Sequence, residues 1–393
     1  MKIETLVTRL LFAGLALSLV FIYFSQERLF SFMTKGDNAL GFERYFRIAS
    51  TILVIAAAFI TLFFVKKKYA FSIYFAYGIL LVYLILNFLI SGGDILNPTD
   101  IMNTKGFGVW LCFGLIFVSY DEYRYTLFKR FLFMAIIVIA LLSCYNFFEF
   151  GAGLYRGQAL SKYRVYAVNY VWVAPYVFLI LKGNKKLAWL RIFALFMGLI
   201  LALITQTRSF ILIYFMVLIF DYFHTKKKTP YLVAFSVFMV LAVYFITNMD
   251  IISRSLDLLI NRGVNDTRTG QLSLFFNQLN IIEIIPGKGF FASYKFGNTE
   301  LYFLDNQWLY LLWWGGLIPV TAYFYLTAII PFKMFITSNI SYETRVECFI
   351  MLLWVLGLAG LAIYTTMNFD FFFLVISIIQ GRVLYKYSLL KND

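Results

Sequence analysis

The chain has 393 residues, of which 62% are hydrophobic and only 14% are charged. Roughly a quarter of the residues of a soluble globular domain are charged, so this composition excludes an ordinary soluble enzyme. The formal net charge of +14 does not indicate a nucleic-acid partner, because in so apolar a chain it follows from the Lys and Arg excess of cytoplasmic loops in membrane proteins.

Apolar runs long enough to cross a bilayer as helices follow one another along the whole chain. We expect an all-α polytopic membrane protein, one multi-pass domain over residues 1–393, with about twelve transmembrane helices. The first run lacks the small-residue cleavage site of a signal peptide and is interpreted as the first span. The predicted spans are 8–25, 48–65, 71–92, 106–120, 131–148, 167–182, 188–205, 209–223, 231–248, 304–330, 346–365 and 370–386.

Four basic loops set the predicted orientation. They read "VKKKY", "DEYRYTLFKR", "KGNKK" and "HTKKKTP", and all four fall on the same side of the membrane in this arrangement. Cytoplasmic loops are the ones enriched in Lys and Arg. We therefore expect both termini in the cytoplasm. The predicted outer segments use more Arg than Lys, and Arg is the cation with the fork that binds phosphate.

Two predicted outer loops, 149–166 and 249–303, are long enough to carry chemistry. The second, a long extracytoplasmic loop, contains "RTGQLSLFFNQLN", in which apolar residues recur at helical spacing. This pattern predicts an amphipathic helix on the outer membrane surface. Pro286 then ends regular structure, and Gly287 and Gly289 permit a tight turn.

A series of motifs follows in order along the second half of the chain. An Arg precedes the apolar helix, then come a Pro, a Gly-x-Gly, a polar pair before the next span, and a Gly pair. The residues are Arg268, Pro286, Gly287, Lys288, Gly289, Asp305, Asn306, Gly315 and Gly316. Two further arginines are Arg208 in "TQTRSF" and Arg164 in "YRVYAVNY".

In these motifs, over about residues 150–330, the chain resembles the O-antigen ligase and O-antigen polymerase family of bacterial surface-glycan enzymes. The resemblance implies a GT-C-like membrane fold in the bacterial cytoplasmic (inner) membrane. Ligases of this family carry His where this chain has Asp305, and a second Gly where it has Pro319. Both departures favour the polymerase branch.

The resemblance implies transfer of a glycan from a polyprenyl pyrophosphate carrier to a hydroxyl of a lipid-linked repeat unit. The product would be O-antigen, capsule or exopolysaccharide. Expected partners are these lipid-linked oligosaccharides, the bilayer, a flippase and a chain-length regulator, with no nucleic acid. No outer Asp-x-Asp pair or His offers metal ligands, so we expect neither metal nor another cofactor, and arginines in place of a metal at the pyrophosphate.

The expected catalytic residues are Asp305, Arg268 and Arg208; the expected substrate-binding residues are Arg164, Arg156, Arg262, Asn306 and Glu300. Each has a structural alternative. Arg208 could be an interfacial anchor, and Arg268 could pair with Asp266 or Glu300. Asp305 suits a general base but equally a helix N-cap, with Glu300 as the rival base.

Two other functions stay open at this stage. An O-antigen ligase is weakened by the missing outer His. A flippase for lipid-linked oligosaccharides belongs to a different class, and transporters of that kind show paired halves and charges within spans. This chain has one long outer loop and no visible internal repeat.

Overall fold

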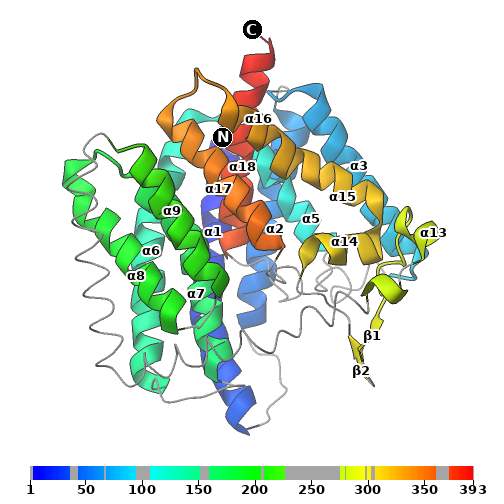
Figure 1. Cartoon of the computed structure of the whole chain (residues 1–393), viewed down its shortest axis with the longest axis horizontal. Helices are drawn as coiled ribbons and strands as arrows, with labels where there is room; N and C mark the ends of the chain where they lie inside the picture. The colour runs from blue at the N-terminus through cyan, green and yellow to red at the C-terminus, as the bar shows by residue number, and fades with distance from the viewer. Residues whose placement is uncertain are drawn as a thin grey trace. The chain divides into compact units, whose positions relative to one another are not determined.

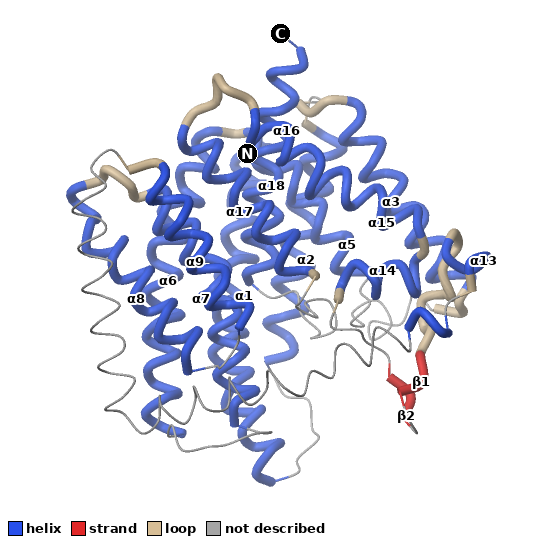
Figure 2. Tube along the Cα trace, viewed as in Figure 1, coloured by secondary structure: helices blue, strands red, loops and turns tan. Residues whose placement is uncertain are grey.

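The computed structural model describes residues 3–35, 43–65, 68–93, 107–150, 159–204, 208–225, 275–278, 280–296, 299–301, 306–359 and 371–392. Apart from one short hairpin, its regular structure is helical (Figures 1 and 2). The elements are α1 (Ile3–Lys35), α2 (Glu43–Phe64), α3 (Phe71–Ile90), α5 (Phe107–Phe113), η1 (Gly114–Tyr120), α6 (Glu122–Phe150), α7 (Ala159–Ile180), η2 (Lys185–Leu187), α8 (Ala188–Ile204), α9 (Arg208–Phe223), α13 (Ile281–Ile284), β1 (Tyr294–Phe296), β2 (Thr299–Leu301), α14 (Gln307–Gly315), α15 (Leu317–Phe324), η3 (Tyr325–Ile329), α16 (Ile330–Ile336), α17 (Tyr342–Leu358) and α18 (Phe371–Asn392).

Within the described residues, 6 helices are long and apolar enough to cross a membrane. They confirm the expectation of a multi-pass helical membrane protein. Their ranges are Ile3–Tyr23, Tyr45–Phe64, Phe71–Ile90, Glu122–Tyr145, Leu317–Ile336 and Phe371–Lys391. Shorter apolar helices occupy Trp110–Tyr120, Val168–Ile180 and Phe210–Phe223. The predicted span 231–248 lies outside the described residues, and the total of twelve stays a prediction.

The predicted span 304–330 is divided in the structure. Helix α14 ends at Gly315, and Gly316 has φ 82° and ψ −172°, a conformation essentially confined to glycine. The membrane-length helix begins only at Leu317 and continues through α15, η3 and α16 to Ile336. The unbroken apolar sequence hid this boundary, because hydropathy does not register a change of backbone direction.

Contacts between Cα atoms divide the chain into two units. The first comprises Met1–Phe21, Phe42–Phe128 and Thr267–Asp393; the second comprises Ile22–Gly41 and Lys129–Asp266.

The core of the first unit lies where α18 packs against η1. Every residue of η1 is buried. A Cβ on Gly381 would lie 2.1 Å from the carbonyl oxygen of Ile116, so only glycine permits this approach. The Ser119 hydroxyl donates to the carbonyl of Ile378 at 2.7 Å, and the Tyr69 hydroxyl donates to that of Ile116 at 2.7 Å. These bonds satisfy two buried hydroxyl groups and join α18 and the segment before α3 to η1.

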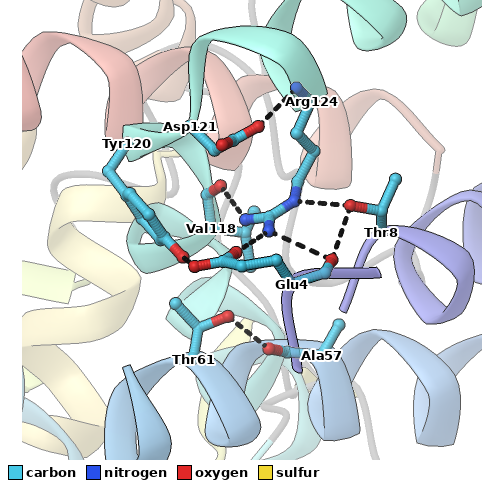
Figure 3. A network of polar contacts seen from close by, with 8 residues as sticks. All are labelled: Glu4, Thr8, Ala57, Thr61, Val118, Tyr120, Asp121 and Arg124. Carbon is cyan, nitrogen blue, oxygen red and sulfur yellow. Dashed lines mark hydrogen bonds and ion pairs between the residues drawn. The ribbon is translucent and has the colours of Figure 1, made fainter. Parts of the chain in front are cut away.

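Charged residues gather beside the C-terminal end of η1 (Figure 3). The Arg124 guanidinium donates to the carbonyl of Val118 at 2.8 Å, to Thr8 Oγ1 at 3.1 Å and to the Glu4 carboxylate at 2.5 Å. The Tyr120 hydroxyl donates to the same carboxylate. A cation at a helix C-terminus offsets the negative end of the dipole. Arg124 therefore ties α1 and α6 to η1.

A second ion pair joins α17 and α18. The fully buried Glu347 carboxylate accepts from Lys386 Nζ at 2.9 Å and from the Tyr125 hydroxyl at 2.9 Å. Removing one member of such a pair leaves the other charge buried without compensation.

Glu347→Ala is therefore expected to lower the free energy of unfolding by about 3 kcal/mol. Thermal or denaturant unfolding of the purified protein in detergent micelles measures this loss. The double variant Glu347→Leu with Lys386→Met should recover most of it, because no unpaired charge remains. A wild-type unfolding midpoint for Glu347→Ala alone would show that the pair contributes nothing.

The second unit contains the C-terminal parts of α1 and α6 together with α7, η2, α8 and α9. A Cβ on Gly198 would lie 1.9 Å from the Tyr214 hydroxyl, so α8 and α9 meet closely there. At one end, the buried Asp221 carboxylate pairs with Lys182 at 3.0 Å and with Arg191 at 2.6 Å. These contacts bring together the beginnings of the basic loops "KGNKK" and "HTKKKTP", which we predicted on one side of the membrane.

Candidate functional site

The PGKG turn (Pro286–Gly289) follows α13, and the local sequence explains its shape. Asn280 Oδ1 accepts from the N–H of Ile282, and the Glu283 carboxylate accepts from the N–H of Asn280, which together form a capping box. At the other end, the N–H of Gly287 donates to the carbonyl of Glu283 at 2.8 Å. Gly287 itself has a positive φ of 78°. A glycine with positive φ is the usual end of a helix.

Three backbone hydrogen bonds join the PGKG turn and the preceding Ile285 to the α14–α15 junction (Trp313–Leu317). The N–H of Lys288 donates to the Trp313 carbonyl at 2.7 Å, and the N–H of Gly289 donates to the Trp314 carbonyl at 3.1 Å. The N–H of Leu317 donates to the Ile285 carbonyl at 3.2 Å. The turn thus satisfies groups that a helix end otherwise leaves unpaired.

Glycines on both sides make this contact possible. A Cβ on Gly287 would lie 2.6 Å from the backbone nitrogen of Gly316 and 2.6 Å from the Trp314 carbonyl oxygen. A Cβ on Gly316 would lie 2.3 Å from the Ile285 carbonyl oxygen. The Gly-x-Gly and Gly-Gly motifs, separate in the sequence, therefore form one backbone-to-backbone contact.

Helix α3 holds the turn from a third side. The Tyr83 hydroxyl donates to the Pro286 carbonyl at 2.7 Å. Asn87 Nδ2 donates to the carbonyls of Pro286 and Trp314 at 3.4 and 3.3 Å, and Ser91 Oγ accepts from the N–H of Phe290 at 2.8 Å. Sequence reasoning missed these residues. Their signal was a polar side chain at every fourth position of an apolar helix, which places them on one face.

Lys288 is committed to the loop itself. Its ammonium donates to the Gln278 carbonyl at 2.7 Å, pairs with the Glu283 carboxylate at 3.0 Å and lies 4.3 Å from the centre of the Trp313 ring. The hydrogen bond from Lys288 is the main cause that lowers the pKa of the Glu283 carboxyl. Lys288 therefore fastens the helical segment before the turn to the turn itself.

The rest of the described loop packs on α14. The buried Phe275 ring lies 5.1 Å from the Trp313 ring, and the Gln278 amide pairs with both backbone groups of Lys295. The strands β1 and β2 form an antiparallel hairpin in which Lys295 faces Glu300 (Figure 1). This hairpin was not predicted. Only the last turn of the predicted amphipathic helix, 275–278, falls within the described residues, and it is helical.

Asn306 is the N-cap of α14. Its Oδ1 atom accepts from the N–H of Leu309 at 3.2 Å. The cap position that the sequence left open for Asp305 is thus occupied by its neighbour. Trp308 is a packing residue, because its indole N–H donates to the Val355 carbonyl at 3.2 Å and its ring lies 5.5 Å from the Tyr323 ring.

The predicted site residues have different positions in the structure. Glu300 is exposed on β2, Asn306 caps α14, Arg208 begins α9 and Arg164 lies within α7. The side chains of Arg164 and Arg208 lie outside the described part. Four further residues lie outside the described part with both backbone and side chain: Arg156, Arg262, Arg268 and Asp305. Of the motif residues, the glycines of the two pairs meet in the structure.

Comparison with known proteins gave no relative of this chain. No protein-family model matches it, no curated protein is significantly similar in sequence, and no solved structure is significantly similar in fold. The candidate site therefore rests on the residues and contacts described above.

Proposed function

We propose that this protein is a membrane glycosyltransferase that polymerises a bacterial surface polysaccharide from repeat units linked to polyprenyl pyrophosphate. The observation that carries the proposal is the contact between the PGKG turn and Gly315–Gly316. These two motifs, in this order, are among those that carry the resemblance to the O-antigen ligase and polymerase family. Their direct contact supports reading them as parts of one device.

The contact also explains how the site would be held. The turn fixes the C-terminal end of α14, and the 9 residues of this helix set the distance to Asn306 at about 13 Å. On the other side, Phe275 is anchored on Trp313, seven positions after Arg268 in the sequence. The loop therefore contacts α14 through Phe275 and through the PGKG turn. In the sequence, Arg268 lies close to the first of these two contacts.

In the proposed reaction, the hydroxyl oxygen of the incoming repeat unit bonds to the anomeric carbon of the growing glycan. The bond from that carbon to the pyrophosphate oxygen breaks, and the carrier leaves as polyprenyl pyrophosphate. Asp305, or Glu300 as its rival, accepts the hydroxyl proton. Arg208 and Arg268, with Arg164, Arg156 and Arg262 as further binding groups, stabilise the charge that develops on the pyrophosphate.

The orientation we propose places loop 249–303 outside the cytoplasm. Support comes from α3, whose two ends make different contacts. At its start, the N–H of Ala70 donates to Ser388 Oγ near the C-terminus, whereas Asn87 in its last turn donates to the Pro286 carbonyl of the PGKG turn. These ends are about 30 Å apart.

Cysteines placed at Ser253 and Ser293 in a cysteine-free background should react with a membrane-impermeant thiol reagent in spheroplasts. A cysteine at Lys227, in the basic loop, should be protected until the membrane is opened. Labelling at Lys227 together with protection at the other two positions would reverse the proposed topology.

Transfer is expected to be independent of divalent metal. Arginine can take the role of the metal at the leaving pyrophosphate, since both neutralise negative charge. Polymer formation by the purified protein should continue in excess EDTA at the rate seen without it. Loss of polymer in EDTA, restored by adding a divalent ion, would contradict the arginine-based mechanism.

The function itself can be tested in cells that lack the native copy. The proposal predicts surface glycans of one repeat unit only, with long chains restored by the intact gene. Loss of all glycan from its acceptor, with full-length chains still accumulating on the lipid carrier, would instead indicate a ligase. Accumulation of lipid-linked single units on the cytoplasmic leaflet would indicate a flippase.

A further inference from the structure

A groove of about 660 Å³ runs between the last turns of α3 and the PGKG turn. One wall is made by Leu86, Asn87 and Ile90, and the other by Pro286, Gly289 and Phe291. Both walls belong to the first unit. The groove is open toward the outside of the unit, because Ile90 is 85% exposed and Leu86 is 50% exposed.

The polarity of the groove argues against an anionic ligand. Among its described lining residues Lys288 alone carries a charge, and that charge is paired with Glu283 at 3.0 Å. Tyr83, Asn87 and Ser91 each hydrogen-bond to the loop and so hold the walls together. What the groove offers to a ligand is mainly apolar surface.

The surroundings of the groove identify the medium that covers it. Helix α3 is a candidate membrane span, and Phe75, Val82, Leu86 and Leu89 leave one of its faces exposed and apolar. The α13 segment that leads into the PGKG turn also exposes apolar side chains, since Ile282 is 78% exposed and Ile285 is 60% exposed. Apolar side chains beside the end of a span are covered by the bilayer at its interface.

We propose that an acyl chain of a bilayer phospholipid lies in this groove and ties the PGKG turn to α3. The chain enters from the lipid that covers α3 and contacts Leu86, Ile90 and Phe291. Its methylene groups contact the apolar lining of the groove and gain the dispersion attraction that an unfilled groove forfeits. The lipid is a structural component of the loop and takes no part in glycan transfer.

The test uses the full-length protein, freed of lipid, in detergent micelles that receive a rising fraction of phosphatidylcholine with a photoreactive diazirine near the end of one chain. Labelled peptides are quantified by mass spectrometry. Labelling of peptides that contain Ile90 and Phe291 should saturate at a low fraction of the probe, because a single site fills. Labelling of the open α3 face at Phe75 and Val82 should rise in proportion to the probe.

Two further arms make the outcome decisive. Ala292→Trp narrows the groove and should lower labelling at Ile90 by about tenfold through steric overlap. Val82→Trp, on α3 like Ile90 but outside the groove, should leave the labelling at Ile90 unchanged. Proportional labelling at Ile90 in the wild-type protein would overturn the site. Displacement of the label by an equimolar polyprenyl phosphate, but not by unlabelled phosphatidylcholine, would overturn the phospholipid as occupant. None of these readouts requires transferase activity.

Discussion

Gly316→Ala is expected to destabilise the protein by about 2–5 kcal/mol and to abolish polymer formation. At φ 82° and ψ −172° an alanine is strained, and its Cβ would lie 2.3 Å from the Ile285 carbonyl oxygen. Neither atom can move freely, because the same carbonyl accepts from the N–H of Leu317. Gly287→Ala meets the same obstacle from the other side, with contacts of 2.6 Å to backbone atoms.

Thermal unfolding of the purified variants, followed by an elongation assay, measures both effects. Gly78 supplies the matched control, because a Cβ there has no atom within 4 Å and the residue lies inside α3. Gly78→Ala should keep or raise the melting temperature, since Ala is favoured over Gly in helices by about 1 kcal/mol. If Gly316→Ala unfolds at the same temperature as Gly78→Ala, the turn and the α14–α15 junction do not depend on each other.

Arg208→Lys and Arg268→Lys are expected to reduce polymerisation almost as much as the corresponding alanine variants. Lysine keeps the charge but lacks the planar fork that binds phosphate through two parallel hydrogen bonds. Losing a contact made to developing charge in the transition state lowers the rate by about 10²–10³. The measurement is glycan chain length in cells that lack the native copy, with the membrane level of each variant determined in parallel.

Arg345→Lys is the control for charge replacement elsewhere in the chain. Arg345 lies at the start of α17, outside the proposed site, and donates to the carbonyls of Thr337 and Ser338 at 3.4 Å. The Arg345→Lys variant should support normal chain length. Long chains from both lysine variants and both alanine variants of Arg208 and Arg268 would leave these arginines as interfacial anchors.

The sequence predicted most of the described long helices, because a span must be apolar over its full length whatever it packs against. Helices α1 and α6 each cover a predicted span, and α2 and α3 each match one to within two residues at its C-terminal end. The division at Gly316 was not predicted, since it depends on a backbone contact with the distant PGKG turn. The buried pair of Glu347 and Lys386 was not predicted either, because it also depends on a contact between residues far apart in the sequence.

The candidate site shows the same limit. The positive φ values of Gly287 and Gly289 confirm the predicted tight turn, because Gly-x-Gly after Pro is a local signal. The capping box of Asn280 and Glu283 was readable in "NIIE" but went unnoticed. Tyr83, Asn87 and Ser91 could not be assigned a role from the sequence, because their hydrogen bonds are made to a loop about 200 residues away in the chain.

The central claim is that this protein lengthens lipid-linked glycans, and a reconstituted reaction tests it most directly. The purified protein is placed in liposomes with a polyprenyl-pyrophosphate-linked repeat unit as the only substrate, and the products are separated by size. The account predicts a ladder that grows by whole repeat units, remains attached to the carrier lipid and releases one polyprenyl pyrophosphate for each bond formed. Repeat units that stay single, with no carrier released by an intact and folded protein, would contradict it.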